Sequence, residues 1–364
     1  MLTPNGPFDL GVEEEYQLID PATWELGSTI HAILEKDLEN GRQDVQAEFL
    51  QSQVEASTRI CPTVRQVREE VWRMRQQASI IAASLGLTLV AAGTHPFSQW
   101  TMQQVTRGDR YAILAEELQE VGRRLVTFGL HVHVGIADPD RRVQALNRIR
   151  PYLSLLLALS TSSPFFAGRF TGLRSYRSAL IAALPRSGIP PCFATWADYQ
   201  DVISTLTGEG LLANPSFIWW DARLSSRFPT LEIRIADMPA RVEDTVCLAA
   251  WAQSLVVRLL QEPPRKALSP LILESNKWQA ARYGLEARLI LDAEGPARPV
   301  REWVNRLVEQ LSDTARELDC LPELAHARTI LDRGTSADEQ LQIWHETNDL
   351  GAVIQALSKI DPPT

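Results

Sequence analysis

Four segments of this chain place carboxylates, imidazoles or a guanidinium on one face and apolar residues on the other. This pattern limits the possible folds more than any other feature. Successive side chains of an extended strand point to opposite faces of a sheet. Each segment therefore predicts a strand with one charged face and one apolar face. The segments span residues 8–19, 46–58, 129–136 and 230–235.

The first segment contains Gly-Val-Glu-Glu-Glu-Tyr at positions 11–16. Glu13 and Glu15 point the same way, whereas Glu14 falls on the otherwise apolar face. At an effective dielectric constant of about 20, two like charges about 4 Å apart repel by about 4 kcal/mol. A solvated edge or a cation held between Glu13 and Glu15 would each explain this pair.

The second segment carries Glu48 and Glu55, which are seven positions apart. An unbroken strand would put them on opposite faces, because side chains alternate along a strand. A turn near Gln51-Ser52, or two turns of helix, would bring them together. The spacing does not distinguish these two arrangements from ordinary surface carboxylates.

The third segment, Gly-Leu-His-Val-His-Val-Gly, puts His131 and His133 on one face of an apolar strand. Two imidazoles are costly to bury without polar partners. They indicate either a binding site or histidines whose hydrogen bonds are satisfied in the core or at an edge. The pattern is not typical of zinc, because no cysteine or third histidine lies near them.

The fourth segment, Thr-Leu-Glu-Ile-Arg-Ile-Ala-Asp at 230–237, puts Glu232 and Arg234 on one face. They form either a salt bridge on a sheet face or a metal ligand beside a phosphate-binding guanidinium. Arg223 and Arg227, just upstream, add positive charge.

If these strands share a sheet, its charged face holds five carboxylates and an imidazole, which are Glu13, Glu15, Glu48, Glu55, Glu232 and His131. So many carboxylates in one pocket require divalent cations. Oxygen-rich ligation selects Mg²⁺ or Mn²⁺, and one imidazole suits Mn²⁺ especially. Metals beside arginines suit a nucleoside triphosphate.

The remaining segments predict helices at 62–85, at 109–128 and after Asp138-Pro139, and a strand at 87–92. Strands and helices in this uneven mixture indicate an α+β fold, with an antiparallel or mixed sheet covered on one face by helices. We expect a single catalytic domain over 1–364, mainly helical from about 240. Residues 163–200 read as an irregular excursion, which is either a lid carrying Arg169, Arg174 and Arg177 or a surface loop.

Composition excludes several classes of protein. A net charge of −9 argues against sequence-independent binding of nucleic acid. The longest apolar stretch, at 152–160, is too short to span a bilayer and predicts a buried helix. The first residues do not form a secretory signal, and the four cysteines are scattered. We therefore expect a cytoplasmic protein with reduced cysteines and no membrane partner.

These motifs occur in the order of a known family, together with Gly-Thr-His-Pro-Phe at 93–97. Over roughly residues 8–290 the chain resembles the type 2 glutamate–cysteine ligase (carboxylate–amine ligase) family. The resemblance implies the glutamine synthetase/guanido kinase fold, with an antiparallel sheet as one wall of a funnel-shaped site. It also implies that the five carboxylates and His131 hold two or three Mg²⁺ ions, and that Arg234 meets the γ-phosphate of ATP.

The activity implied by this resemblance is ATP-dependent amide formation through an acyl phosphate, with γ-glutamyl transfer to a small-molecule amine. The expected roles are catalytic for Arg234 and Glu232, phosphate-binding for Arg234, Arg227 and Arg223, and substrate-binding for His133, Thr94 and Arg174. A guanidino kinase and a non-catalytic Mg-ATP-binding protein are the alternatives. The sequence is compatible with a homo-oligomer, and no residue in it identifies the amine.

Overall fold

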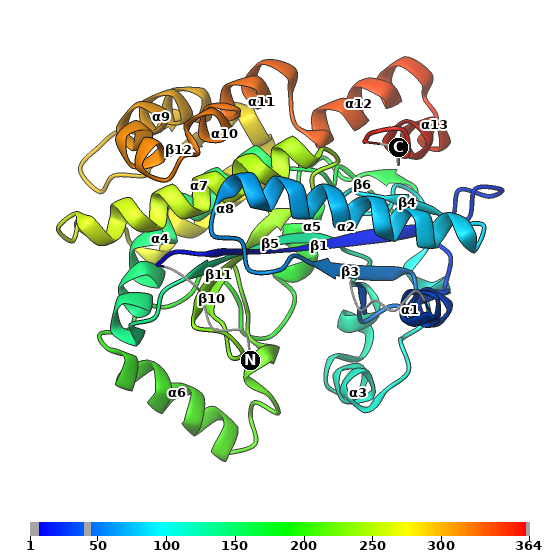
Figure 1. Ribbon diagram of the computed structural model, residues 1–364, viewed down its shortest axis with the longest axis horizontal. Helices are drawn as coiled ribbons and strands as arrows, with labels where there is room; N and C mark the ends of the chain where they lie inside the picture. The colour runs from blue at the N-terminus through cyan, green and yellow to red at the C-terminus, as the bar shows by residue number, and fades with distance from the viewer. Residues whose placement is uncertain (1–6, 40–44, 362–364) are drawn as a thin grey trace.

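The computed structural model describes residues 7–39 and 45–361, and its centre is one seven-stranded antiparallel sheet (Figure 1). The strand order is β10-β11-β5-β1-β3-β2, with β4 also paired to β1. The strands are β1 (Leu10–Ile19), β2 (Val45–Ala47), β3 (Gln53–Ser57), β4 (Thr88–Val90), β5 (Gly129–Gly135), β10 (Ala222–Leu224) and β11 (Thr230–Asp237). All four charged segments contribute to this sheet, and the predicted α+β class is confirmed.

Helices cover the apolar face of the sheet, while the charged face opens on the other side (Figure 1). Three long helices pack closely on the strands, and they are α2 (Val64–Ser84), α4 (Pro139–Ser160) and α7 (Val242–Gln261). The predicted buried helix at 152–160 lies within α4 and is confirmed. On the open side, α3 (Asp109–Arg123) and α6 (Trp196–Gly208) flank the charged face. The charged face of the sheet and one side of α3 line the same cavity.

The chain from Val242 onward is mostly helical, and from Val300 onward it forms an outer layer above α7 (Figure 1). Its further helices are α8 (Pro270–Tyr283), α9 (Val300–Glu317), α10 (Leu321–Ala325), α11 (Ala327–Arg333), α12 (Ser336–Thr347) and α13 (Leu350–Leu357). Between α8 and α9 lie the short strands β12 (Arg288–Leu289) and β13 (Arg298–Pro299), while α1 (Ile30–Glu39) lies early in the chain. One hydrophobic cluster runs from β1 to α11, so sheet and outer helices share a core. No helix in the described part of the chain is long and apolar enough to cross a bilayer.

Two of the predicted helix boundaries needed correction. The helix expected from Pro62 begins at Val64, because the Thr63 side chain accepts the Gln66 N–H and caps it. The helix expected to reach Phe128 ends at Arg123. The backbone beyond it is extended instead, and the Phe128 N–H donates to the Gly93 carbonyl at 2.9 Å.

Residues 163–200 are more ordered than the sequence suggests, so the expectation of an irregular excursion was wrong. They contain β6 (Phe165–Phe166), β7 (Arg169–Phe170), α5 (Tyr176–Ile181), β8 (Ser187–Gly188) and the start of α6. β8 pairs in parallel with β9 (Trp219–Trp220). The prolines and glycines of this segment lie between several short elements rather than in one long loop. A lid role for the segment stays a prediction.

Glu14, the exception on the apolar face of β1, is fully buried in an ion pair with Arg75 of α2. The pair is bidentate, with nitrogen–oxygen distances of 2.6 and 2.7 Å. Tyr16 and Thr245 also donate hydrogen bonds to the Glu14 carboxylate. Glu14 therefore ties β1 to α2 and α7 behind the charged face.

We expect Arg75→Met to lower the free energy of unfolding by about 3–5 kcal/mol, because it leaves the Glu14 carboxylate buried without a partner. Urea unfolding would measure this. The control is Lys36→Met, which breaks the exposed Lys36–Glu39 pair and should cost less than about 1 kcal/mol. Equal losses in the two variants would contradict a structural role for the buried pair.

Candidate functional site

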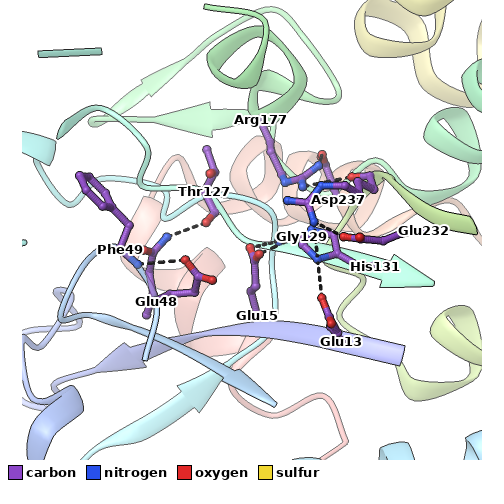
Figure 2. Close-up of polar contacts among 12 residues, drawn as sticks. Glu13, Glu15, Glu48, Phe49, Thr127, Gly129, His131, Arg177, Glu232 and Asp237 are labelled. Carbon is purple, nitrogen blue, oxygen red and sulfur yellow. Dashed lines mark hydrogen bonds and ion pairs between the residues drawn. The ribbon is translucent and has the colours of Figure 1, made fainter. Parts of the chain in front are cut away.

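The register of the sheet brings the charged side chains of β1 opposite those of its neighbours (Figure 2). Glu13 lies opposite His131 of β5, and Glu15 lies opposite Glu55 of β3. Glu15 also accepts a hydrogen bond of 2.6 Å from the backbone N–H of Gly129. Residues far apart in the sequence therefore meet through strand pairing alone.

A β-bulge in β11 sets the position of Arg234. Glu232 pairs with His133, but the register then shifts, so that Arg234 and Ile235 both stand opposite the single residue His131. Arg234 nevertheless shares the face of Glu232 and forms an ion pair with it. The bulge thus places the Arg234 guanidinium next to the Glu232 carboxylate.

The β2–β3 hairpin explains how Glu48 and Glu55, seven positions apart, come to lie side by side. A turn at Gln51-Ser52 reverses the chain, which is one of the two arrangements that the spacing left open. Glu48 directly follows β2, and Glu55 lies in β3. Both carboxylates therefore reach Glu15.

Two clusters of possible metal ligands result. In one, carboxylate oxygens of Glu15, Glu48 and Glu55 all lie within 4.8 Å of one another. In the other, Glu13, His133 and Glu232 offer ligand atoms within the same limit. Carboxylates with a single imidazole are the donors that suit Mg²⁺ or Mn²⁺. His133, expected to contact substrate, belongs to the second cluster.

His131 lies between the two clusters rather than in either. Its Nδ1 is 3.1 Å from a Glu13 oxygen, and its Nε2 is 3.6 Å from a Glu15 oxygen. Burial and the charge of Arg234 lower the pKa of His131 to about 4. Its imidazole is therefore neutral at pH 7 and can offer a lone pair.

Electrostatics distinguish the two clusters. Burial and the charge of Glu48 raise the pKa of Glu15 to about 7, and burial with three neighbouring carboxylates raises the pKa of Glu55 well above its usual range. Burial also opposes ionisation of Glu13, but His133 and His131 outweigh it and hold the pKa of Glu13 well below its usual range. Arg177 and Arg234 lower the pKa of Glu15 but do not outweigh burial and Glu48, so the cluster of Glu15, Glu48 and Glu55 keeps an excess of negative charge that a divalent cation would offset.

The three arginines expected to bind phosphate occupy different environments. Arg223 makes a bidentate pair with Glu232 at 2.8 and 3.0 Å and also donates to two backbone carbonyls. Arg234 shares the same carboxylate. These two guanidinium charges outweigh burial and lower the pKa of Glu232. Arg227 is exposed at the edge of the site.

All of these groups line one cavity of about 250 Å³. Its described lining does not include Thr94 or Arg174, which were expected to bind substrate. Thr94 is buried and donates to the Phe165 carbonyl at 2.7 Å, and Arg174 faces Asp338 at 3.5 Å. Arg177, three residues after Arg174, does line the cavity, as do residues that sequence reasoning did not single out, among them Gln46, Gln53, Arg110, Tyr111 and Thr127.

Comparison with known proteins identifies the family. Residues 9–356 match the model of glutamate–cysteine ligase family 2. A relative from Solibacter usitatus, named provisionally as glutamate–cysteine ligase 2, is 39% identical over 95% of this chain and 91% of its own length. A relative of the same provisional name from Sorangium cellulosum is 40% identical over 97% and 96%. The chain belongs to glutamate–cysteine ligase family 2. The resemblance drawn from its motifs is confirmed, and so is the class of ATP-dependent carboxylate–amine ligase.

Solved structures agree with the family 2 assignment at the level of the fold. A glutamate–cysteine ligase from Francisella tularensis, solved in complex with AMP, matches with a TM-score of 0.74 at 11% identity over 98% of this chain and 90% of that one. A bifunctional glutathione synthetase from Pasteurella multocida matches with a TM-score of 0.68 at 14% identity over 96% and 52%. The expected fold, an antiparallel sheet that forms one wall of the site with helices packed on its other face, is confirmed.

Glu15 should destabilise the metal-free protein as pH rises. Its pKa is raised from 4.5 to about 7, so folding favours its protonated form, and the penalty grows between these values. Glu15→Gln should therefore stabilise the metal-free protein by on the order of 2–3 kcal/mol at pH 8 and hardly at all near pH 4.5. The same variant should gain less stability from added Mg²⁺ than the wild type.

Thermal unfolding at both pH values, with and without Mg²⁺, would measure this. Glu120→Gln is the control, because Glu120 lies on the exposed side of α3 with Arg124. A Glu15→Gln variant that is less stable than the wild type at pH 8 would mean that Glu15 serves the fold rather than a cation.

Proposed function

We propose that this chain uses Mg²⁺ and ATP to convert the γ-carboxylate of glutamate to an acyl phosphate, with release of ADP. An amine then attacks the acyl carbon, which forms the amide and expels inorganic phosphate. The observation that carries the proposal is the pairing of two ligand clusters with arginines on a single sheet face. Carboxylates alone would repel in this cavity, and arginines alone would bind any anion. Together they suit a metal-bound triphosphate.

The residues that fit the metals are the two clusters described above. Glu15, Glu48 and Glu55 would hold one ion, and Glu13, His133 and Glu232 another, with the neutral His131 between them. Bound Mg²⁺ would offset the charge of the phosphates during transfer. The raised pKa values of Glu15 and Glu55 support this reading, because they mark buried carboxylates whose mutual repulsion the neighbouring arginines do not offset.

Arg234 is the proposed catalytic cation. It is held by Glu232 and by the bulge, and the Glu232 charge outweighs burial and raises its pKa, so it stays protonated. A fixed guanidinium can stabilise the charge that develops on the transferring phosphoryl group. Glu232 orients Arg234 and Arg223 together, which couples phosphate binding to the second metal cluster.

The acyl phosphate must be protected from water, and the cavity lining supports this. Its wall includes apolar side chains, among them Leu114, Leu118, Leu184 and Phe217, which are all buried. Excluding water also strengthens the electrostatic interactions inside the site.

The defining experiment is phosphate release in the presence of a panel of amino acids and amines. A ligase should release one phosphate per amide formed, and only when glutamate and an amine are both present. A guanidino kinase would instead make a stable phosphoguanidine without releasing phosphate, and a Mg-ATP-binding protein would turn nothing over. Phosphate release that needs no amine would contradict the ligase proposal.

Arg234→Lys should lower kcat by on the order of 10²–10³ and change Mg-ATP affinity far less, because lysine keeps the charge but loses the planar fork. Turnover, Mg-ATP binding and thermal unfolding would be measured on one sample. Arg124→Lys, at the exposed residue that directly follows α3, is the matched control. Normal turnover per folded Arg234→Lys molecule would remove Arg234 from the mechanism.

A further inference from the structure

One cysteine of this chain lies in a chemical environment that the proposed function does not use. Cys61, Cys247 and Cys320 are buried in the core, whereas Cys192 is exposed. Cys192 lies between β8 and α6, in a segment without regular secondary structure. The described lining of the catalytic cavity does not include it. Among the four cysteines, Cys192 is therefore the one that a molecule in solution can reach.

The sulfur of Cys192 contacts a buried cation. Arg150, in α4, is only 8% exposed, and its Nη1 donates a hydrogen bond to the Cys192 Sγ. Within the part of the chain that the structure describes, Arg150 forms no ion pair with a carboxylate, and its buried Nε has no hydrogen-bond partner. A guanidinium this buried normally has its donors satisfied. Arg150 instead directs its charge at a sulfur atom.

Asn147 holds the backbone beside Cys192 in place. It lies about one turn before Arg150 in α4, and its Nδ2 donates to the Phe193 carbonyl at 2.6 Å. Its Oδ1 accepts the Phe193 N–H at 3.2 Å. Phe193 is also buried, and its ring packs edge-on against Tyr199, with ring centroids 5.1 Å apart. These contacts fix the residue that follows Cys192, so the sulfur stays next to Arg150.

This arrangement favours the ionised form of the Cys192 side chain. An adjacent arginine stabilises a thiolate, and the thiolate rather than the thiol is the nucleophile. A thiolate would in turn supply Arg150 with the counter-charge that no carboxylate provides. Since Cys192 is exposed while Arg150 is buried, the sulfur is stabilised from the protein side and remains open to solvent.

We propose that Cys192 is a site of reversible modification by small disulfides. The Cys192 thiolate attacks one sulfur of the disulfide and forms a new S–S bond with it, while the other half leaves as a thiolate. Cys192 is thereby oxidised and the departing half is reduced, so the small disulfide is the only oxidant needed. A second thiol reverses the exchange by attacking the mixed disulfide, and Arg150 then stabilises Cys192 as the leaving group.

This inference goes beyond the proposed ligase activity and does not depend on it. Neither Cys192 nor Arg150 is among the described residues that line the catalytic cavity. Reactive cysteines are typically exposed and lie beside a positive charge, and Cys192 meets both conditions. The buried cysteines lack the first condition.

The first measurement is the rate at which iodoacetamide, a neutral alkylating reagent, labels each cysteine of the wild-type protein at about pH 6.5. Cys192 should react at least about fivefold faster than N-acetylcysteine under the same conditions, because few ordinary thiols are ionised at that pH. Mass spectrometry assigns the label. Cys61, Cys247 and Cys320 should stay unlabelled, which shows in the same sample that the protein is folded. A Cys192 rate no faster than that of N-acetylcysteine would overturn the proposal.

Two variants test the role of Arg150. Arg150→Met should slow the labelling of Cys192 to within about twofold of N-acetylcysteine, because the cation is lost. Asn147→Ala keeps the arginine but frees the loop, so it should also slow labelling. Arg141→Met, at an exposed position of the same helix, is the matched control and should label at the wild-type rate. An unchanged Cys192 rate in folded Arg150→Met would overturn the proposal. If that variant does not fold, an unchanged rate in Asn147→Ala would overturn it.

The exchange itself is measured with hydroxyethyl disulfide, a small neutral disulfide. Wild-type protein should gain a single thioethanol group at Cys192, and dithiothreitol should remove it. Cys192→Ser should gain none. Arg150→Met should form the adduct at least about fivefold more slowly. Failure of the wild type to form the adduct, or equal rates in the wild type and Arg150→Met, would contradict the assignment of Cys192.

Discussion

Five carboxylates on one face of the sheet repel one another, and the surrounding structure must hold them together against that repulsion. Such charges can be brought together only if each has a partner or a cation nearby. The protein provides partners on one side of the site, where Arg223 and Arg234 flank Glu232 and two histidines flank Glu13. On the other side, Glu15, Glu48 and Glu55 face one another. That asymmetry separates a neutralised region from one that favours a cation.

Holding like charges together requires a stiff support, and the opposite face of the sheet supplies it. The Glu14–Arg75 pair locks β1 to α2, and Thr245 extends the same network to α7. Asp237 has a similar structural role at the end of β11, where it accepts hydrogen bonds from the Ser162 N–H and from the hydroxyls of Ser163 and Ser175. Both are buried carboxylates used for structure. They show that burial of a charge in this fold does not by itself mark a catalytic residue.

The segment after α4 both supports the sheet and lines the cavity. Its serines hold Asp237, while Arg177 from the same segment enters the cavity. The Arg177 guanidinium packs against Gly129, the first residue of β5, where an added Cβ atom would overlap it. A single residue without a side chain thus lets a cation lie on the sheet beside the acidic cluster. Arg174, only one helical turn away in sequence, faces Asp338 instead.

The α+β class, the faces of the strands, the family and most of the charged residues of the site follow from the sequence alone. Side chains alternate along a strand whatever the rest of the fold, so the sequence pattern alone predicts the face of the sheet on which Glu13, Glu15, His131 and Glu232 lie. Tertiary structure decided what depends on pairing across distance. The hairpin joined Glu48 to Glu55, the bulge aimed Arg234, and helix packing explained Glu14. It also put Arg177 rather than Thr94 or Arg174 in the cavity, because which side chain reaches a site depends on the packing of residues that are remote in sequence.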